Sequence, residues 1–392
     1  MSYQRIYRPR LFVSWPLYQF SVGQLKKTLW TESFLLDDSN VAGYNHSADS
    51  LYKMIQLDPA RYSMFKLDQA TSGKWLYLYY HLSDNTNEYA GLLHPDDIDK
   101  ITQGFDYFMI LGHNLKSCGL CYSISAGNAN LTSFRNLQNG GMINAAEVSS
   151  KATPEYNGFS WSEINGGSAG HGDPAIKIAI GNHNYESPAS DTLAIGSLLW
   201  GKSFTFPYNA DIEQSTSFKY GIKSKESATG RSVSVKNWAQ RNKWATNPFT
   251  LSQDNIGNYA IDAYQMSGRR VWNCKFSFLA PENVVGQNLN TNSIGWSNTW
   301  TNADSVSTTY SGYEVDGNNE SLYDLLSPAD TDFYSIVVNR TLGGALPMVL
   351  QLDAVDGGNP DSFAIVKMDP NYEIRHVGKD LYEVELGLIE QI

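Results

Sequence analysis

Cysteine is scarce in this sequence, and its scarcity limits what can hold the fold together. The 392 residues contain three cysteines, Cys118, Cys121 and Cys274. Three thiols cannot all pair, and they are too few for a secreted scaffold built on disulfides. Cys118 and Cys121 have the spacing of a zinc or redox site, but no second pair of ligands follows at the distance that zinc requires. We therefore expect reduced thiols, with Cys118 and Cys121 buried at a turn between strands.

Long apolar runs and dense positive charge are missing as well. No run approaches the ~18 to 20 apolar residues that cross a bilayer. Arg5, Arg8 and Arg10 interrupt the segment in which a signal peptide would carry its apolar core. These features predict synthesis in a cytoplasm without signal-peptide export or membrane insertion. The formal net charge of −11 argues against specific nucleic-acid binding, because contacts to a phosphate backbone need concentrated lysine and arginine.

The composition favours strands over helices. Only 18% of the residues are charged, whereas 13% are aromatic and 32 are glycine. Such a composition is typical of short strands joined by tight turns, and a helical bundle would contain more lysine and glutamate. The length allows two or three domains at roughly 150 residues each. We predict a mainly β protein with two domains, residues 1–200 and 201–392.

Residues 1–200 carry short apolar segments separated by clusters of glycine, asparagine, aspartate and serine. Segments of this kind predict the strands of an all-β sandwich. The predicted strands cover residues 11–13, 75–80, 107–111, 122–124, 175–180 and 193–195.

The middle of the sequence differs from the part before it. Residues 217–224 alternate with a period of two, which predicts a strand with Phe218, Tyr220 and Ile222 turned inward. Polar residues with several tryptophans follow, and we predict a long loop or hairpin at about 224–258. A long loop inside a compact domain usually has a function, which here would be contact with a neighbouring chain.

The end of the sequence predicts one more sheet. Its first strand alternates with a period of two, so Trp272, Cys274, Phe276 and Phe278 are expected to share one face of a strand with a wet side. The last strand alternates in the same way. The four predicted strands cover residues 271–279, 346–352, 362–368 and 380–390.

One helix is predicted between these strands. Ser327 can cap its first turn, Pro328 suits the first helical position, and Asp330 supplies the acidic third residue of a capping box. Apolar residues then recur at helical spacing, and the two glycines at 343–344 end the helix. This helix is expected to pack on the predicted sheet.

An aspartate-rich turn near the end of the chain offers the oxygen ligands that calcium prefers. Asp353, Asp356 and Asp361 lie around Gly357 and Gly358. The turn lacks the full twelve-residue pattern of an EF-hand, so a polar hairpin turn without a metal is the alternative interpretation.

Patterns for catalysis and for cofactor binding are missing. The sequence has no Walker A motif, no Rossmann glycine fingerprint and no metalloprotease histidine pair. His171 and His183 lie near carboxylates, but no nucleophile in a suitable setting accompanies them. His113 follows an apolar strand directly, and we expect it to hydrogen-bond the adjoining loop. We therefore expect no enzyme activity and no cofactor.

Several tryptophans, among them Trp161 and Trp200, allow two interpretations. They could stack on sugar rings, as in glycan-binding sandwiches, or they could anchor the core and a subunit interface. The second interpretation is favoured, because tryptophan is enriched at interface hot spots. Glycan binding stays open as the alternative.

A series of motifs between residues 190 and 392 carries a resemblance. It includes LAIGSLLWG from Leu193, FKYGIK from Phe218, GRRVWNCKFSFL from Gly268, GGALPMVLQ from Gly343 and YEVEL from Tyr382. In this order the motifs are similar to virion structural proteins of tailed bacteriophages, marine ones especially. A helix bounded by glycine, a strand, a Pro-Asp turn and a terminal strand also look like the tail-tube-like β domain of distal and minor tail proteins.

The first 190 residues resemble this family less specifically. Leu57–Arg61 and Ile110–Leu115 look like landmarks of the galactose-binding-like jelly rolls that some phage proteins carry. The resemblance thus implies an N-terminal jelly-roll sandwich followed by a C-terminal tail-tube-like β domain with one packed helix.

The function that the resemblance implies is structural. The chain would be a component of the phage tail that forms a homo-oligomeric ring and links the tube to the baseplate or fibres, without catalytic residues. A host-glycan-binding adhesion module and a head or neck decoration protein are the alternatives. The residues expected at the interface between copies are Trp238, Trp244, Arg269, Arg270 and Trp272.

Overall fold

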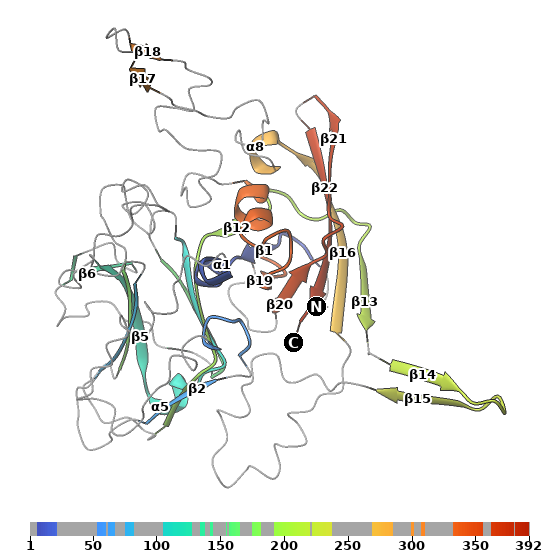
Figure 1. Cartoon of the computed structure of the whole chain (residues 1–392), viewed down its shortest axis with the longest axis horizontal. Helices are drawn as coiled ribbons and strands as arrows, with labels where there is room; N and C mark the ends of the chain where they lie inside the picture. The colour runs from blue at the N-terminus through green and yellow to red at the C-terminus, as the bar shows by residue number, and fades with distance from the viewer. Residues whose placement is uncertain are drawn as a thin grey trace.

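The structure is a computed structural model, and strands dominate it (Figure 1). Neighbouring strands are antiparallel in every described pair. The expectation of a mainly β protein is confirmed. The described residues are 6–21, 53–59, 62–66, 75–81, 105–127, 134–137, 142–143, 154, 157–164, 175–181, 192–219, 222–236, 269–284, 299–301, 307–309, 332–355, 362–379 and 381–391.

Two layers of strands form the N-terminal lobe. The first is a five-stranded sheet in the order β3 (Trp75–His81), β9 (Ala175–Gly181), β5 (Cys121–Gly127), β6 (Phe134–Asn136) and β7 (Met142–Ile143). The second consists of the sheet β11 (Ser197–Gly201), β4 (Tyr107–Leu111) and β8 (Phe159–Glu163), with the pair β10 (Thr192–Ile195) and β2 (Ser63–Lys66). The strands predicted between residues 75 and 195 are all present.

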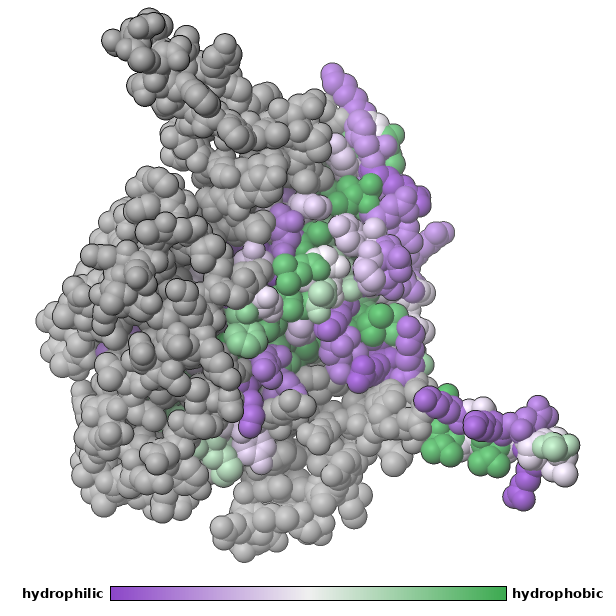
Figure 2. Space-filling view, in the orientation of Figure 1, coloured by the Kyte–Doolittle hydropathy of each residue, from purple (hydrophilic) through white to green (hydrophobic). Residues whose placement is uncertain are grey.

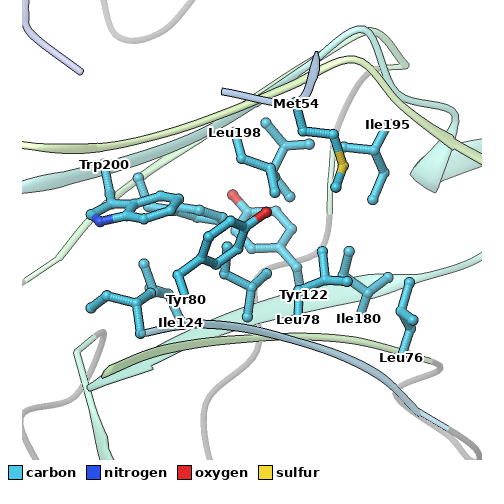
Figure 3. Packing of buried hydrophobic residues seen from close by; sticks show 14 of the residues in the cluster. Met54, Leu76, Leu78, Tyr80, Tyr122, Ile124, Ile180, Ile195, Leu198 and Trp200 are labelled. Carbon is cyan, nitrogen blue, oxygen red and sulfur yellow. The ribbon is translucent and has the colours of Figure 1, made fainter. Parts of the chain in front are cut away.

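Apolar side chains from both layers fill the space between them (Figure 3). Leu76, Leu78 and Tyr80 come from alternate positions of β3, whereas Leu198 and Trp200 come from β11, and all five are buried. Alternation along β3 sends every second residue to the same face of the sheet. The two layers therefore enclose the core of a β-sandwich.

Strand β4 is buried on both of its faces. Phe108 and Ile110 belong to the sandwich core, whereas Tyr107, Met109 and Leu111 belong to a second cluster that also contains residues of the C-terminal sheet. A strand without a polar face has a continuous apolar sequence, as this one does. The second layer of the sandwich thus serves as the middle of a larger stack.

Aromatic rings join the N-terminal lobe to the C-terminal sheet in this shared cluster. The ring centroid of Phe363 lies 4.7 Å from that of Phe159 and 6.0 Å from that of Phe12. Arg10 adds polar contacts at the same junction, since its guanidinium lies 4.9 Å from the ring centroid of Phe12 and its Nε donates to Ser203 Oγ at 2.8 Å. Tilted aromatic pairs contribute roughly 0.5–1.5 kcal/mol each beyond the burial of their area.

An eight-stranded sheet forms the C-terminal lobe, with β21 paired to β22 beside its main path. Its order is β12 (Ser203–Thr205), β1 (Arg10–Phe12), β19 (Met348–Gln351), β20 (Phe363–Met368), β22 (Leu381–Glu390), β16 (Arg269–Leu279) and β13 (Ser215–Lys219), and β21 is Glu373–Gly378. The four strands predicted for the end of the chain are confirmed. β1 pairs with β12 and β19, so a strand near the start of the chain belongs to the C-terminal sheet.

A short helix packs on this sheet, as predicted, but its form and position differ. The helix η4 (Tyr334–Asn339) is a π-helix, and its apolar residues Ile336 and Val337 lie in the core of the sheet. The predicted capping residues Ser327, Pro328 and Asp330 lie outside the described residues.

The polar contacts at the two ends of η4 come from residues inside the described segment. The Oδ1 atom of Asp332 accepts a hydrogen bond from the backbone N–H of Ser335 at 2.9 Å. Gly343 and Gly344 follow the helix with φ of +68° and +93°. The helix ends at Asn339, earlier than the predicted stop, and the two glycines lie in the turns that lead to β19, where glycine adopts such angles without a side-chain clash.

A β-bulge interrupts the alternation of β16. Trp272, Cys274 and Phe276 are buried as predicted, but Phe278 is 73% exposed and Leu279 is buried instead. The pairing with β22 shifts between Phe276 and Leu279, and Phe278 has a φ of +63°. The predicted inward position of Phe278 is wrong, because an extra residue in a strand reverses the alternation beyond it.

Helix α1 (Trp15–Ser21) follows β1 and connects the two lobes. Trp15 belongs to the sandwich core and Leu17 to the shared cluster. The hydroxyl of Ser14 accepts a hydrogen bond from the Leu17 N–H at 3.3 Å, as an N-cap residue does.

The remaining described elements are short. They are α5 (Leu115–Cys118), α8 (Pro281–Val284) and the pair β17 (Thr299–Thr301) and β18 (Ser307–Thr309).

Replacing Phe278 with glycine is expected to raise the free energy of unfolding by about 0.5–1 kcal/mol, because glycine adopts a positive φ without steric cost. Phe278→Ala is the matched control, since it removes the ring but keeps a Cβ at the positive φ. Urea denaturation measures both variants against the original chain. Equal effects of glycine and alanine would show that the backbone at this position is not strained.

Candidate assembly interface

A β-hairpin extends away from the body of the molecule at one end of the C-terminal sheet (Figure 1). It consists of β14 (Ile222–Glu226) and β15 (Ser232–Lys236), and we call residues 222–236 the arm. Every described side chain of the arm is exposed. A two-stranded hairpin on its own is at best marginally stable in water. A second surface that covers the arm would therefore stabilise it.

The arm corrects the predicted burial of residues 217–224. Phe218 is 39% exposed and Ile222 is 59% exposed, because the chain passes here from the edge strand β13 into the exposed arm. Tyr220 lies outside the described residues. A hairpin at 222–236 occupies the start of the long loop or hairpin predicted at about 224–258, and residues 237–258 lie outside the described residues.

The tip of the arm is a well-defined turn. The Gly230 N–H donates to the carbonyl of Ser227 at 2.9 Å, and Gly230 has a φ of +78°. The Ser227 hydroxyl accepts a hydrogen bond from the Arg231 N–H at 3.1 Å. A turn that closes with a residue at positive φ fits the twist of the two flanking strands. The arm is therefore a hairpin with a fixed register.

Basic and apolar side chains share one face of the arm. Lys223 pairs with Val235 and Lys225 pairs with Val233, and residues directly opposite each other lie on the same face. Figure 2 shows hydrophilic atoms along β14 and hydrophobic atoms along β15. Residues 222–236 contain four basic residues and one acidic residue, which give a net charge of +3 in a chain of −11. The arm is thus a cationic element on an acidic protein.

A charged surface covers the open half of the C-terminal sheet. Lys275 of β16 pairs with Glu385 of β22, which pairs with Glu373 of β21, so these side chains form a row across three strands. The next row contains Glu383 and Arg375. We call this surface the acidic face, and its residues are Lys275, Glu373, Arg375, Glu383 and Glu385.

Ion pairs organise the acidic face. Lys275 Nζ lies 2.7 Å from Glu383 Oε2, and Arg375 donates two hydrogen bonds to Glu373. The hydrogen bond from Lys275 holds the pKa of Glu383 below its usual range, and that from Arg375 does the same for Glu373. Three carboxylates share two cations on this surface, so it keeps a negative charge at neutral pH.

The structure places one of the predicted contact residues, Trp272, in the core of the chain itself, with the partly exposed Arg270 packed over it. Trp272 is 1% exposed, and its indole packs under Arg270, whose guanidinium lies 4.8 Å from the ring centroid. Arg270 also binds Glu390, with its terminal nitrogen 2.6 Å from Oε1. Contrary to the prediction, the Trp272 side chain is not available to a second copy, because it fills the core between the sheet and η4.

The remaining predicted contact residues have other positions. Arg269 opens β16 and pairs with Lys219 of β13, beside the start of the arm. Trp238 and Trp244 lie outside the described residues. Sequence reasoning missed Val233 and Val235, although their alternation with serine and lysine is visible, because alternation alone does not tell which sheet a strand joins.

Of the three calcium candidates, Asp353 is described and has a local role. Its Oδ1 accepts a hydrogen bond from the Val355 N–H at 3.1 Å, a contact that shapes a turn. Asp356 and Asp361 lie outside the described residues. The calcium site stays a prediction.

The cysteines and the described tryptophans serve packing. Cys118, Cys121 and Cys274 are buried and form no disulfide, as expected, with Cys118 at the end of α5 and Cys121 at the start of β5. Trp200 is buried in the sandwich core, and the ring of Trp161 packs with Phe12 and Arg10 in the shared cluster. These two tryptophans are therefore engaged within the chain.

His113 is fully buried beside the loop that follows β4. Its Nδ1 accepts a hydrogen bond from the Leu115 N–H at 3.3 Å, which confirms the expected contact with the adjoining loop. Burial lowers the pKa of His113 to about 3, although a hydrogen bond with the backbone of Phe159 opposes this shift. The imidazole is therefore neutral at physiological pH.

The described residues contain neither a metal-binding cluster nor a membrane-crossing helix. No three histidine, cysteine, aspartate or glutamate side chains in them gather closely enough to hold a metal ion. None of the helices found there has the length and apolar character needed to cross a membrane.

Comparison with known proteins leaves the family open. No protein-family model matches the chain, and no curated protein matches it. Among solved structures, the chain is similar to CBM32-1 from a family 31 glycoside hydrolase of Clostridium perfringens, at 13% identity and a TM-score of 0.22. The match covers 42% of this chain and 97% of that one. A similarity at this level carries no conclusion about the ligand or the function.

The stability of the protein is expected to fall in acid because of His113. Its pKa is about 3 in the folded chain against an ordinary 6.5, so only the unfolded chain binds a proton between these values. The part of the free energy of unfolding that depends on His113 is constant above pH 6.5, and it falls by roughly 1.4 kcal/mol per pH unit between pH 6.5 and about 3. His113→Asn should remove this part of the slope, whereas His376→Asn, at an exposed position, should keep it. Urea denaturation at a series of pH values gives both slopes, and an unchanged slope in His113→Asn would contradict the assignment.

Proposed function

We propose that this chain is a structural protein of a tailed bacteriophage virion, a tail-tip, distal tail or minor tail component. In this proposal it is made in the host cytoplasm, forms a homo-oligomeric ring, and links the tail tube to the baseplate or fibres. The resemblance of residues 190–392 to virion structural proteins suggests the particle, and the arm suggests the mode of assembly.

The single observation that carries the proposal is the arm. Val233 and Val235 are exposed on one face of a hairpin that extends from the body, and Ile222 is exposed on its other face. Exposed apolar side chains gathered on a projecting element are typical of a contact surface. The arm also brings positive charge to a protein whose net charge is −11. Both properties favour binding to an acidic protein surface.

The proposed domains keep the predicted division near residue 200, except that β1, within residues 1–200, belongs to the C-terminal sheet. The N-terminal lobe would be a galactose-binding-like jelly roll, which its two facing layers of strands support. The C-terminal lobe would be a tail-tube-like β domain, supported by its long antiparallel sheet with one packed helix. In this arrangement the C-terminal sheet joins neighbouring copies, and the N-terminal lobe lies toward the outside of the ring.

The purified chain is expected to form a closed ring, and the triple variant Ile222→Ser, Val233→Ser, Val235→Ser is expected to stay monomeric. Its thermal midpoint should change little, because these side chains are exposed in the single chain. The matched control is Ile212→Ser with Val355→Ser, which removes exposed apolar side chains outside the arm.

Native mass spectrometry and negative-stain imaging measure the assembly, and mass spectrometry of purified phage particles tests the location. A chain that stays monomeric at all concentrations and is missing from particles would overturn the proposed function.

A further inference from the structure

We infer that the arm of one copy binds the acidic face of the next copy, so that copies join head to tail. This inference rests on the assembly role proposed above and names the two surfaces that meet. Each copy would offer its arm to one neighbour and its acidic face to the other.

Opposite charges occur at the same spacing on the two surfaces. Lys223 and Lys225 stand two residues apart on one face of β14, and Glu383 and Glu385 stand two residues apart on one face of β22. Residues two apart in a strand are separated by roughly 6.8 Å. An arm lying along β22 can therefore bring both lysines to both carboxylates. Because the acidic face has one carboxylate more than its own cations, one added lysine neutralises it.

Apolar side chains complete the match. The lysine face of the arm also carries Val233 and Val235. At one end of the acidic face, Phe278, Val377 and Leu381 are exposed. Charges steer two surfaces together and fix their register, whereas buried apolar area supplies much of the affinity. The two surfaces thus correspond in both charge and apolar character.

Phe278 gives a second reason to place a contact at this end of the face. The β-bulge sets Ser277 and Phe278 of β16 against Glu383 of β22, and Phe278 has a φ of +63°. A bulky residue at positive φ is uncommon and lowers the stability of the single chain. The presence of such a residue at an exposed position therefore points to a contact outside the chain.

The position of the arm explains why the contact is between copies. In Figure 1 the arm extends from one end of the C-terminal sheet, and β21 lies at the other end. The arm therefore points away from the acidic face of its own chain. A contact between two different surfaces closes into a ring when the rotation between copies allows it, and otherwise continues as a filament.

The test uses two charge-reversed variants of the full chain. The arm variant carries Lys223→Glu and Lys225→Glu, and the face variant carries Glu383→Lys and Glu385→Lys. Each alone is expected to weaken association at least tenfold in analytical ultracentrifugation, since reversed charges across a contact repel. Reversing the exposed Lys53 and Lys116 of the N-terminal lobe is the matched control and should assemble like the original chain. Thermal midpoints verify that every variant is folded.

Mixing the two variants distinguishes a head-to-tail contact from others. The original face of the arm variant matches the original arm of the face variant, and the two reversed surfaces match each other, so an equal mixture is expected to regain assembly with the two variants alternating. A chain with all four substitutions should regain assembly, because its arm and its face are again opposite in charge. Phe278→Gly removes one exposed apolar side chain at the end of the acidic face. It should weaken association less than charge reversal does, and it should stabilise the monomer.

Two results would overturn the inference while leaving the proposed function in place. The first is a face variant that assembles like the original chain while the arm variant does not, which would indicate pairing between two arms. The second is that both variants assemble as strongly as the original chain. An original chain that never assembles would overturn the proposed function together with this inference.

Discussion

The contact of Phe363 with Phe159 and Phe12 is the constraint on which the rest of the structure depends. These rings come from β20, β8 and β1, three strands that are distant in the sequence. They close the gap between the second layer of the sandwich and the C-terminal sheet, so β4 and β20 have apolar residues on both faces. Because close-packed interiors do not slide easily, this junction fixes the two lobes relative to each other.

The junction also decides which part of the C-terminal sheet stays open. The N-terminal lobe covers β1, β19 and β20, and η4 covers the opposite face of the sheet. The strands β16, β22 and β21 extend beyond the covered region, and there the side chains opposite the core include the five charged residues of the acidic face. The buried junction and the acidic face are therefore two consequences of one arrangement, and the arm begins from the edge strand β13 beside them.

Alternation of apolar and polar residues predicted most of this sheet from the sequence, and its failures have local causes. It predicted the burial of Trp272, Cys274 and Phe276 correctly and failed at Phe278, because one inserted residue changes the face without changing the pattern. It also failed at Ile222, since alternation describes a strand and not the surface on which the strand lies. The three residues of β1 gave no signal that they pair with β12 on one side and with the distant β19 on the other.

The candidate site was harder to predict than the fold for a related reason. A tryptophan beside two arginines is a reasonable interface motif, yet Trp272 and Arg270 pack within the chain and Glu390 binds the guanidinium. Which surfaces combine exposed apolar side chains with charge depends on which strands lie at the edge of the sheet. That property follows from sheet order, and short sequence motifs do not encode it.

The central claim is that the two lobes form one rigid body and that a neighbouring copy stabilises the arm. Backbone hydrogen exchange of the full chain, measured in dilute and in assembled samples, tests it most directly. The account predicts fast exchange of residues 222–236 in the dilute chain and strong protection in the assembly, with β4 and β20 protected in both. Equal exchange of the arm in both samples, or exchange of β4 and β20 as fast as that of the arm, would contradict it.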